Sequence, residues 1–182
     1  MKSNNAMKLY KKIYIKLLVY LGKAVDISSS GHYPADVLSN IKGNKFTIDG
    51  IECGSMEGFL QALKQDDAET QRHLCALKGR EARRRATRDW QRDQRLWWQG
   101  QPIGRESDEY RALLCRAYDT LFEQNVAFRM ALLSTKGKRL FYSHGRHNPK
   151  KTILTEQEFC QILTDLRAKN ADRKTFGTGS RH

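Results

Sequence analysis

The sequence predicts an α+β protein of mainly helical character, a compact single domain with a few short strands and a β-hairpin. The first indication is the spacing of apolar residues at i, i+3 and i+4 in segments 54–64, 107–124 and 155–167, which is typical of amphipathic helices. The second is FTIDGIEC (46–53), in which an Asp-Gly pair supplies a tight two-residue turn between apolar runs. A repeated strand–helix pattern and a glycine-rich phosphate loop are both absent from the sequence.

Length and charge set broad limits on the function. A chain of 182 residues can bury a sizeable core as one domain. Its 33 Lys and Arg against 20 Asp and Glu give a net charge of +13. Such a surface attracts polyanions, whether phosphates, nucleic acid or an acidic membrane, without choosing among them.

The four cysteines, Cys53, Cys75, Cys115 and Cys160, are widely spaced and form no C-x-x-C pair. This pattern favours reduced thiols in a cytoplasmic protein over disulfides, and a metal site is the weakest alternative. No H-E-x-x-H motif and no Ser-His-Asp arrangement accompanies them. We therefore expect no metal and no cofactor.

Residues 1–24 form a basic extension with six lysines and no acid. Alternation of apolar residues from Ile13 to Leu21 predicts a strand, and a short amphipathic helix on a membrane surface is the alternative. Lys16 interrupts the apolar run, so it is a poor membrane span and a poor secretory signal. The domain is expected at 25–168, followed by a disordered basic tail at 169–182.

Local signals mark the ends of several elements. Asp66 or Asp67 is expected to cap a second helix after residues 54–64, with Gly79 at its C-terminal cap. Ser107 caps the long helix that follows. Asn125 opens a short helix that ends near Ser134.

Two further elements are expected near the C-terminus. KRLFYSH (138–144) is a strand candidate. The last helix, from residue 155, begins with a capping box between Thr155 and Glu158.

The helix at 54–64 carries a second stripe beside its apolar one. Glu57, Gln61 and Lys64 recur at i, i+4 and i+7, about a quarter turn from the apolar stripe. A carboxylate can act as acid, base or cation stabiliser, and an amine can supply charge or a nucleophile. A solvated helix edge is the simpler interpretation of the same spacing.

Aromatic and polar residues elsewhere suggest ligand contacts. Trp97 and Trp98 follow a segment with seven Arg and three acids (79–95), a combination that suits stacking on bases and binding of phosphates. At least one of the pair is equally consistent with a core anchor, and Trp90 is interpreted as structural. Ser39 and Asn40 can donate to a sugar or phosphate, or satisfy local backbone groups.

The loop SHGRHNPKKT (143–152) gathers cations after the last predicted strand. His144, Arg146 and His147 lie there with two lysines and no acid or cysteine, which disfavours a metal and favours phosphate. A merely basic loop is the alternative.

Four blocks together resemble a known family. GHYPADVLSN, FTIDGIECGSMEGFLQALK, LWWQGQPIGRESDEYRALLCRAYDTLFEQN and LFYSHGRHNPKKTILTEQEF occur in the order typical of the YbiA-like, or NADAR, family, in its phage and mobile-element branch. The resemblance covers roughly residues 30–167. It implies a compact, mainly helical domain that cleaves N-glycosidic bonds.

The resemblance also implies roles for particular residues. Glu57 matches the family's catalytic glutamate and Lys64 the lysine that closes the same motif. Ser39 and Asn40 match its Ser-Asn pair, and Trp98, or Trp97, its functional tryptophan. Substrate contacts are expected from a further set: Gln61, His144 and Arg146.

Family members act either on phosphorylated intermediates of riboflavin synthesis or on ADP-ribose attached to guanine. Riboflavin-type members carry an aspartate after the final strand, where this chain has Arg146, His147 and Asn148. The expected partner is therefore ADP-ribosylated guanine in DNA, RNA or nucleotide, with possible nucleic-acid backbone contacts and no membrane partner. A non-catalytic module that binds ADP-ribose or nucleic acid is the alternative from another class.

Overall fold

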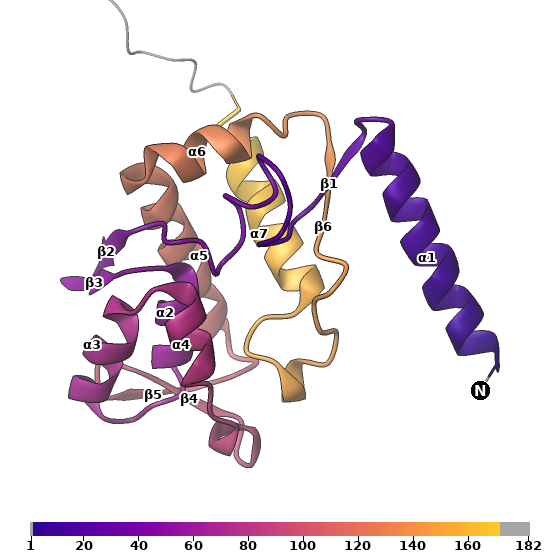
Figure 1. Cartoon of the computed structure of the whole chain (residues 1–182). Helices are drawn as coiled ribbons and strands as arrows, with labels where there is room; N and C mark the ends of the chain where they lie inside the picture. Colours follow the sequence, from indigo (N-terminus) through magenta and orange to yellow (C-terminus); the bar gives the residue numbers. More distant parts are fainter. Residues whose placement is uncertain (1, 172–182) are drawn as a thin grey trace, which may run out of the picture.

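A computed structural model describes residues 2–171 of the chain. Among these residues it has the following helices: α1 (Lys2–Tyr20), α2 (Met56–Ala62), α3 (Ala68–Ala76), α4 (Gly79–Arg84), α5 (Asp108–Gln124), α6 (Val126–Leu133) and α7 (Glu156–Lys169). Two 3₁₀ turns, η1 (Asp89–Gln91) and η2 (Pro149–Lys151), lie in the connecting segments. The predicted mainly helical α+β architecture is confirmed (Figure 1).

The strands pair into three two-stranded sheets. β1 (Ala24–Asp26) and β6 (Arg139–Phe141) are parallel, with Val25 opposite Leu140. β2 (Phe46–Ile48) and β3 (Ile51–Cys53) form the predicted antiparallel hairpin, in which Asp49 and Gly50 both have positive φ. A hairpin that the sequence interpretation missed joins β4 (Arg95–Trp98) to β5 (Gln101–Gly104).

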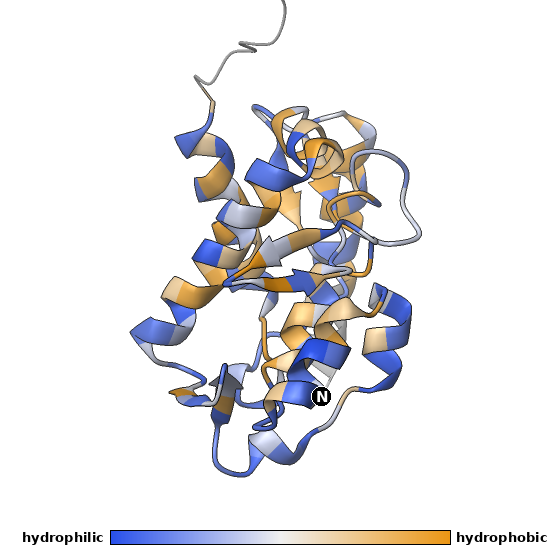
Figure 2. Ribbon diagram, turned by 90° about the vertical axis from the view of Figure 1, so that its left-hand side faces the viewer, coloured by the Kyte–Doolittle hydropathy of each residue, from blue (hydrophilic) through white to orange (hydrophobic). Residues whose placement is uncertain are grey.

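The core lies between α2, α5 and α7 and the strands beside them, and includes Phe59, Leu114, Tyr118 and Phe159. Figure 2 shows hydrophobic residues on the sides of the helices that face one another. α2 packs closely on α3, because a Cβ added at Gly58 would lie 2.7 Å from the carbonyl oxygen of Cys75. This close approach fixes the helix that carries the candidate acid.

Most predicted helix ends are confirmed. Asp67, Ser107 and Asn125 cap α3, α5 and α6 through side-chain oxygens, and Thr155 forms a capping box with Glu158. Gly79 does not cap α3; it opens α4. A Cβ there would lie 2.3 Å from the carbonyl oxygen of Ile41, so a tertiary contact requires this glycine.

The predicted N-terminal strand is wrong, because residues 2–20 form helix α1. The alternation from Ile13 to Leu21 coexists with apolar residues at i, i+3 and i+4, and no neighbouring strand pairs with this segment. None of the described helices is both long and apolar enough to cross a membrane. Of the predicted tail, Lys169 is the last residue of α7, and residues 172–182 lie outside the described part.

Candidate functional site

A pocket of about 300 Å³ opens between α2, the segment after α4, and the loop after β6. Asn40, Glu57, Gln61 and Lys64 line one side of it. The other sides are formed by residues from the Arg-rich segment and the last loop: Arg83, Ala86, Thr87, Arg88, Trp90, Gln91, Tyr142, His144, Gly145, Arg146, Lys151, Thr152, Ile153 and Leu154. The pocket therefore brings together three of the segments that the sequence interpretation singled out.

Glu57, Gln61 and Lys64 form a hydrogen-bonded chain along the pocket. Lys64 Nζ donates to Gln61 Oε1 at 2.7 Å, and Gln61 Nε2 donates to Glu57 Oε1 at 2.8 Å. Gln61 is 5% exposed, so its amide is held between the two charged groups. α2 ends at Ala62, two residues before the predicted end, so Lys64 lies in the turn that follows the helix.

Burial changes the charge equilibrium of Lys64. Removal from water, with a smaller contribution from Arg146, lowers the pKa of this amine to about 8, although Glu57 acts in the opposite direction. A fraction of Lys64 is therefore neutral close to physiological pH. This property suits either a switchable cation or an amine nucleophile.

Hydrogen bonds at Ser55 and Glu57 fix the start of α2. Ser55 Oγ accepts from Gly58 N at 3.0 Å as the N-cap and donates to the carbonyl oxygen of Leu77. The backbone N–H of Glu57 donates to the carbonyl oxygen of Asn40 at 2.9 Å. The hydroxyl of buried Tyr118 donates to Asn40 Oδ1 at 2.8 Å. The amide side chain of Asn40 is thereby oriented beside Glu57.

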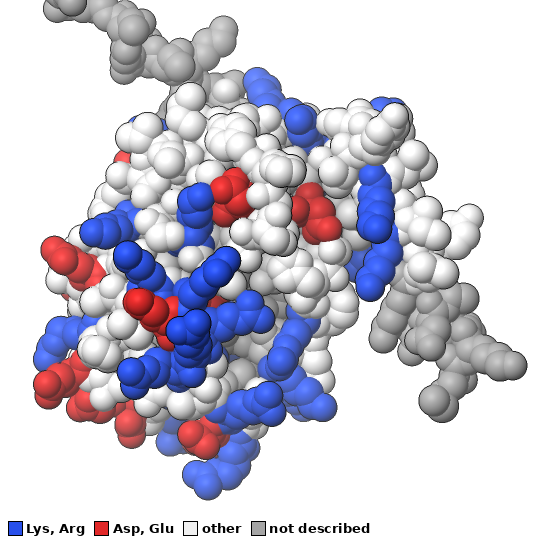
Figure 3. Space-filling model, in the orientation of Figure 1, with Lys and Arg blue, Asp and Glu red and all other residues white. Residues whose placement is uncertain are grey.

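The pocket walls are strongly cationic. Arg83, Arg88, Arg146 and Lys151 line it, while Glu57 is the one carboxylate among the described lining residues. Figure 3 shows Lys and Arg side chains gathered on the face that carries α4. Such a field favours anionic ligands, and phosphates in particular.

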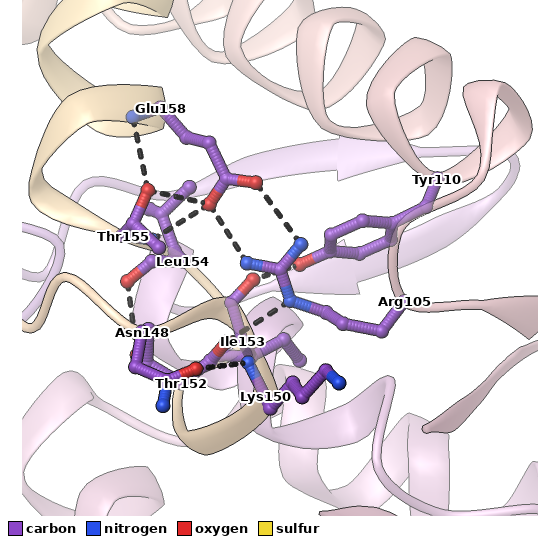
Figure 4. A network of polar contacts seen from close by, with 9 residues as sticks. All are labelled: Arg105, Tyr110, Asn148, Lys150, Thr152, Ile153, Leu154, Thr155 and Glu158. Atoms are coloured by element: carbon purple, nitrogen blue, oxygen red, sulfur yellow. Dashed lines mark hydrogen bonds and ion pairs between the residues drawn. The ribbon is translucent and has the colours of Figure 1, made fainter. Parts of the chain in front are cut away.

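A buried network holds the loop that closes the pocket (Figure 4). Arg105, 1% exposed, donates from Nη1 and Nη2 to the two carboxylate oxygens of Glu158 at 3.0 and 2.7 Å, and from Nε to the carbonyl oxygen of Thr152 at 3.0 Å. Tyr110 donates to the carbonyl oxygen of Ile153. The backbone of Thr152 and Ile153 is therefore held by Arg105, which follows β5 and pairs with Glu158 of α7, and by Tyr110 of α5.

The network also sets the ionisation of its acid. Burial raises the pKa of Glu158, but hydrogen bonds from Arg105 and the Thr155 backbone outweigh burial and hold this pKa below its usual value. Glu158 therefore remains a carboxylate as it caps α7. At the start of the loop that follows β6, the Ser143 hydroxyl donates a hydrogen bond to Asp26 Oδ2 at 2.6 Å.

Aromatic rings reach the pocket from the last loop and from η1. Tyr142 and His144 meet edge to face with centroids 4.3 Å apart, and Trp90 is 4% exposed. Burial, together with the charge of Glu57, raises the pKa of Tyr142 above its usual value, so its hydroxyl stays protonated. Four residues of the pocket were not predicted as site residues, because only the fold brings them to α2: Arg83, Arg88, Trp90 and Tyr142.

Among the residues that the structure describes, no group of three or more His, Cys, Asp and Glu is arranged to hold a metal ion. The four cysteines are free, and Cys53 and Cys75 are buried.

The comparisons with known proteins agree with one another. The family described as bacteriophage protein GP30.3 matches residues 32–168, three quarters of the chain. The chain belongs to this GP30.3 family. A relative from Enterobacteria phage T4, an uncharacterized 17.1 kDa protein of the Gp30–rIII intergenic region, is 40% identical over 147 residues, which cover 79% of this chain and 96% of the relative.

The GP30.3 domain has the fold of YbiA. The NMR structure of the Escherichia coli protein YbiA matches with a TM-score of 0.56 and 17% identity, covering 88% of this chain and 92% of YbiA. The resemblance to the YbiA-like family in its phage branch is thereby confirmed. At this identity the likeness establishes the fold, and α1 lies outside the family match.

Not every predicted substrate contact of this GP30.3 domain lies at the pocket. Asn40, Gln61, His144 and Arg146 line it, whereas Ser39 is 5% exposed and is not among the lining residues. Trp97 and Trp98 were expected to contact the substrate. Both lie on β4, and neither is among the residues that line the pocket.

Each of these tryptophans has a structural partner. Trp98 is 6% exposed and packs edge to face on Phe59 at 5.1 Å, while its Nε1 donates to Asp49 Oδ2 at 2.7 Å. Trp97 is half-buried on the opposite side of the strand, with Arg95 over its ring at 6.0 Å. The tryptophan at the pocket is Trp90, which the sequence interpretation treated as structural.

Proposed function

We propose that this chain is an N-glycosidase that cleaves the bond between ribose and a base, with ADP-ribosylated guanine in nucleic acid or nucleotide as its substrate. The observation that carries the proposal is the position of Glu57, a single carboxylate hydrogen-bonded to Gln61 within a cationic pocket. The YbiA-like fold supports the same reaction class.

The chemistry requires an anion beside the sugar. As the bond between C1′ and the base nitrogen breaks, positive charge develops on the ribose ring. The carboxylate of Glu57 stabilises this charge and accepts a proton from the attacking water, whose oxygen bonds to C1′. The base nitrogen takes up a proton from solvent as its bond to C1′ breaks, and Glu57 returns its proton to solvent. Gln61 holds the carboxylate in place through its 2.8 Å hydrogen bond.

The cations and aromatic rings bind the rest of the substrate. Arg83, Arg88, Arg146 and Lys151 suit the diphosphate. The charged form of Lys64 contacts a phosphate or a ribose hydroxyl. Tyr142 and His144 offer ring surface to the base. Asn40, oriented by Tyr118, donates its amide to the sugar.

An alternative route uses Lys64 as a nucleophile, which its lowered pKa favours. The neutral amine attacks C1′, and the base leaves with a proton from the amine. The ring oxygen then takes a proton from water as its bond to C1′ breaks, which leaves a protonated imine on Nζ. Water then hydrolyses the imine to release the sugar and restore the amine. Borohydride would reduce the imine to a stable adduct, whereas the water route gives none.

A substrate panel tests the proposal. ADP-ribosylated guanine in DNA, in RNA and as nucleotide is incubated with the full chain beside phosphorylated riboflavin precursors, and the products are identified by mass spectrometry. Release of ADP-ribose and unmodified guanine supports the proposal. Turnover of the riboflavin precursors alone, or binding of ADP-ribose without turnover of any substrate, overturns it.

A further inference from the structure

Helix α1 presents an apolar face that the domain leaves uncovered. Its inner side is fixed by buried Ile15, which packs with Ala24 and Phe141, and by the ion pair from Lys11 Nζ to Glu156 at 3.1 Å. Figure 1 shows the helix at the edge of the molecule, beyond the β1–β6 pair. The opposite side therefore faces away from the domain.

The outward face is continuous. At about 100° per residue, eight exposed apolar residues of the helix and its following turn fall within one arc of about 160°. They are Met7, Leu9, Tyr10, Ile13, Tyr14, Leu17, Tyr20 and Leu21, each between 46% and 87% exposed; Val19, 41% exposed, lies outside this arc. Apolar groups that are scattered singly over a surface need no explanation, but a contiguous stripe of this size indicates a binding surface.

Charge identifies the partner. Exposed Lys12 and Lys16 lie along one border of the stripe, and residues 1–24 contain six lysines and no acid. Two copies of α1 placed face to face would bring these lysines together without an acid from this segment to pair them. Nucleic acid would satisfy the lysines but leave the apolar stripe in water. An anionic lipid surface accommodates both groups at once.

We propose that α1 lies in the surface of a membrane containing anionic phospholipid, with its apolar stripe inserted and its lysines at the headgroups. The three tyrosines of the stripe suit this position, since tyrosine favours the boundary between acyl chains and headgroups. This proposal takes up the alternative of an amphipathic helix on a membrane surface and departs from the expectation of no membrane partner.

The placement leaves the candidate site intact. The family match begins at residue 32, so α1 is an addition to the GP30.3 domain and not part of its core. The lipid-binding face is turned away from Ile15 and Lys11, which hold the helix against β6 and α7. Binding to lipid therefore does not depend on the proposed glycosidase activity.

Vesicle flotation tests the proposal with the full chain. Vesicles of phosphatidylcholine alone are compared with vesicles of phosphatidylcholine mixed with phosphatidylglycerol. We expect flotation with the mixed vesicles and at least about tenfold weaker partitioning onto the neutral ones. Absence of flotation with the mixed vesicles, or equal binding to both, overturns the proposal.

Two pairs of variants separate the contributions. Ile13→Ser with Leu17→Ser shortens the apolar stripe and should weaken partitioning onto mixed vesicles by about tenfold or more. The matched control, Val126→Ser with Met130→Ser, removes two equally exposed apolar residues on α6 and should leave binding unchanged. Equal losses from both pairs would show non-specific adsorption and overturn the proposal.

Charge reversal completes the design. Lys12→Glu with Lys16→Glu should abolish the preference for phosphatidylglycerol, whereas Lys45→Glu with Lys136→Glu, the same net change elsewhere on the surface, should keep it. Circular dichroism melts verify that each variant folds. Concentration-dependent dimerisation that requires Ile13 and Leu17, without vesicle binding, would assign the face to a second copy instead.

Discussion

Arg105 and Glu158 form a two-pronged ion pair that joins the end of β5 to the first turn of α7. The guanidinium donates to both carboxylate oxygens, at 3.0 and 2.7 Å, and Arg105 is almost completely buried. Through the third donor of Arg105, the pair also holds the carbonyl oxygen of Thr152, a residue that lines the pocket. Arg105 therefore contributes both to the stability of the domain and to the position of a residue that lines the pocket.

Arg105→Met should lower the free energy of unfolding by about 3 kcal/mol, because a partly buried carboxylate and a carbonyl lose their partner. Urea denaturation measures this loss. The control is Arg111→Met, which removes an exposed pair with Asp108 and should cost less than about 0.5 kcal/mol. Similar losses in the two variants would show that the buried pair contributes nothing particular.

The two tryptophan positions give a second prediction. Trp98→Phe should lower the free energy of unfolding by about 1–3 kcal/mol, because the hydrogen bond to Asp49 is lost, and should leave KM unchanged. Tyr142→Leu should instead raise KM, since its ring lines the pocket. Steady-state kinetics and urea melts of both variants check the assignment, and a raised KM in Trp98→Phe at unchanged stability would contradict it.

Signals confined to a few neighbouring residues were enough to predict much of the fold. The capping box of Thr155 and Glu158 and the Asp49–Gly50 turn are examples, because each satisfies its own backbone groups locally. Placement of Glu57 and Gln61 on one edge of α2 followed from helical periodicity in the same way, whereas Lys64 lies in the turn after the helix. The cap, the turn and the helix edge each depend on residues within a few positions of one another, so the sequence alone is enough to predict them.

Features that depend on distant segments were not predictable by the same means. Gly79 resembles a helix cap, but its close approach to Ile41 is what requires glycine. Trp90 rather than Trp98 reaches the pocket because η1 lies against the last loop, where Gln91 donates to the carbonyl oxygen of Lys151. For the N-terminal segment a strand was preferred and a helix was only the alternative, because its apolar residues satisfy both periods.

Gln61 offers a test of the hydrogen-bonded chain. Gln61→Met keeps the side-chain length but removes both polar contacts, so Glu57 and Lys64 lose their link and kcat should fall by about 10- to 100-fold. Gln161→Met is the control, because Gln161 lies on α7 outside the pocket lining and donates to Asp165 instead. Unchanged kcat in Gln61→Met would remove the chain from the mechanism.

The lowered pKa of Lys64 predicts the alkaline limb of the pH profile. The amine is charged below about pH 8 and neutral above it, so kcat/KM should fall as the pH rises through 8 if the cation binds substrate. Lys64→Arg keeps the charge at all these pH values and should move this limb upward. Three observations together would establish the amine as the nucleophile. The wild-type rate would rise through pH 8, Lys64→Arg would lose activity, and borohydride would trap a covalent adduct.

The central claim is that the carboxylate of Glu57 stabilises positive charge on a ribose during cleavage. Glu57→Gln preserves size and an oxygen acceptor for Gln61 while removing the charge. Single-turnover release of ADP-ribose from modified guanine is the most direct measurement. We expect the rate to fall by about 10²- to 10³-fold in a variant whose urea melt matches the wild type. Release at the wild-type rate from that folded variant would contradict the account.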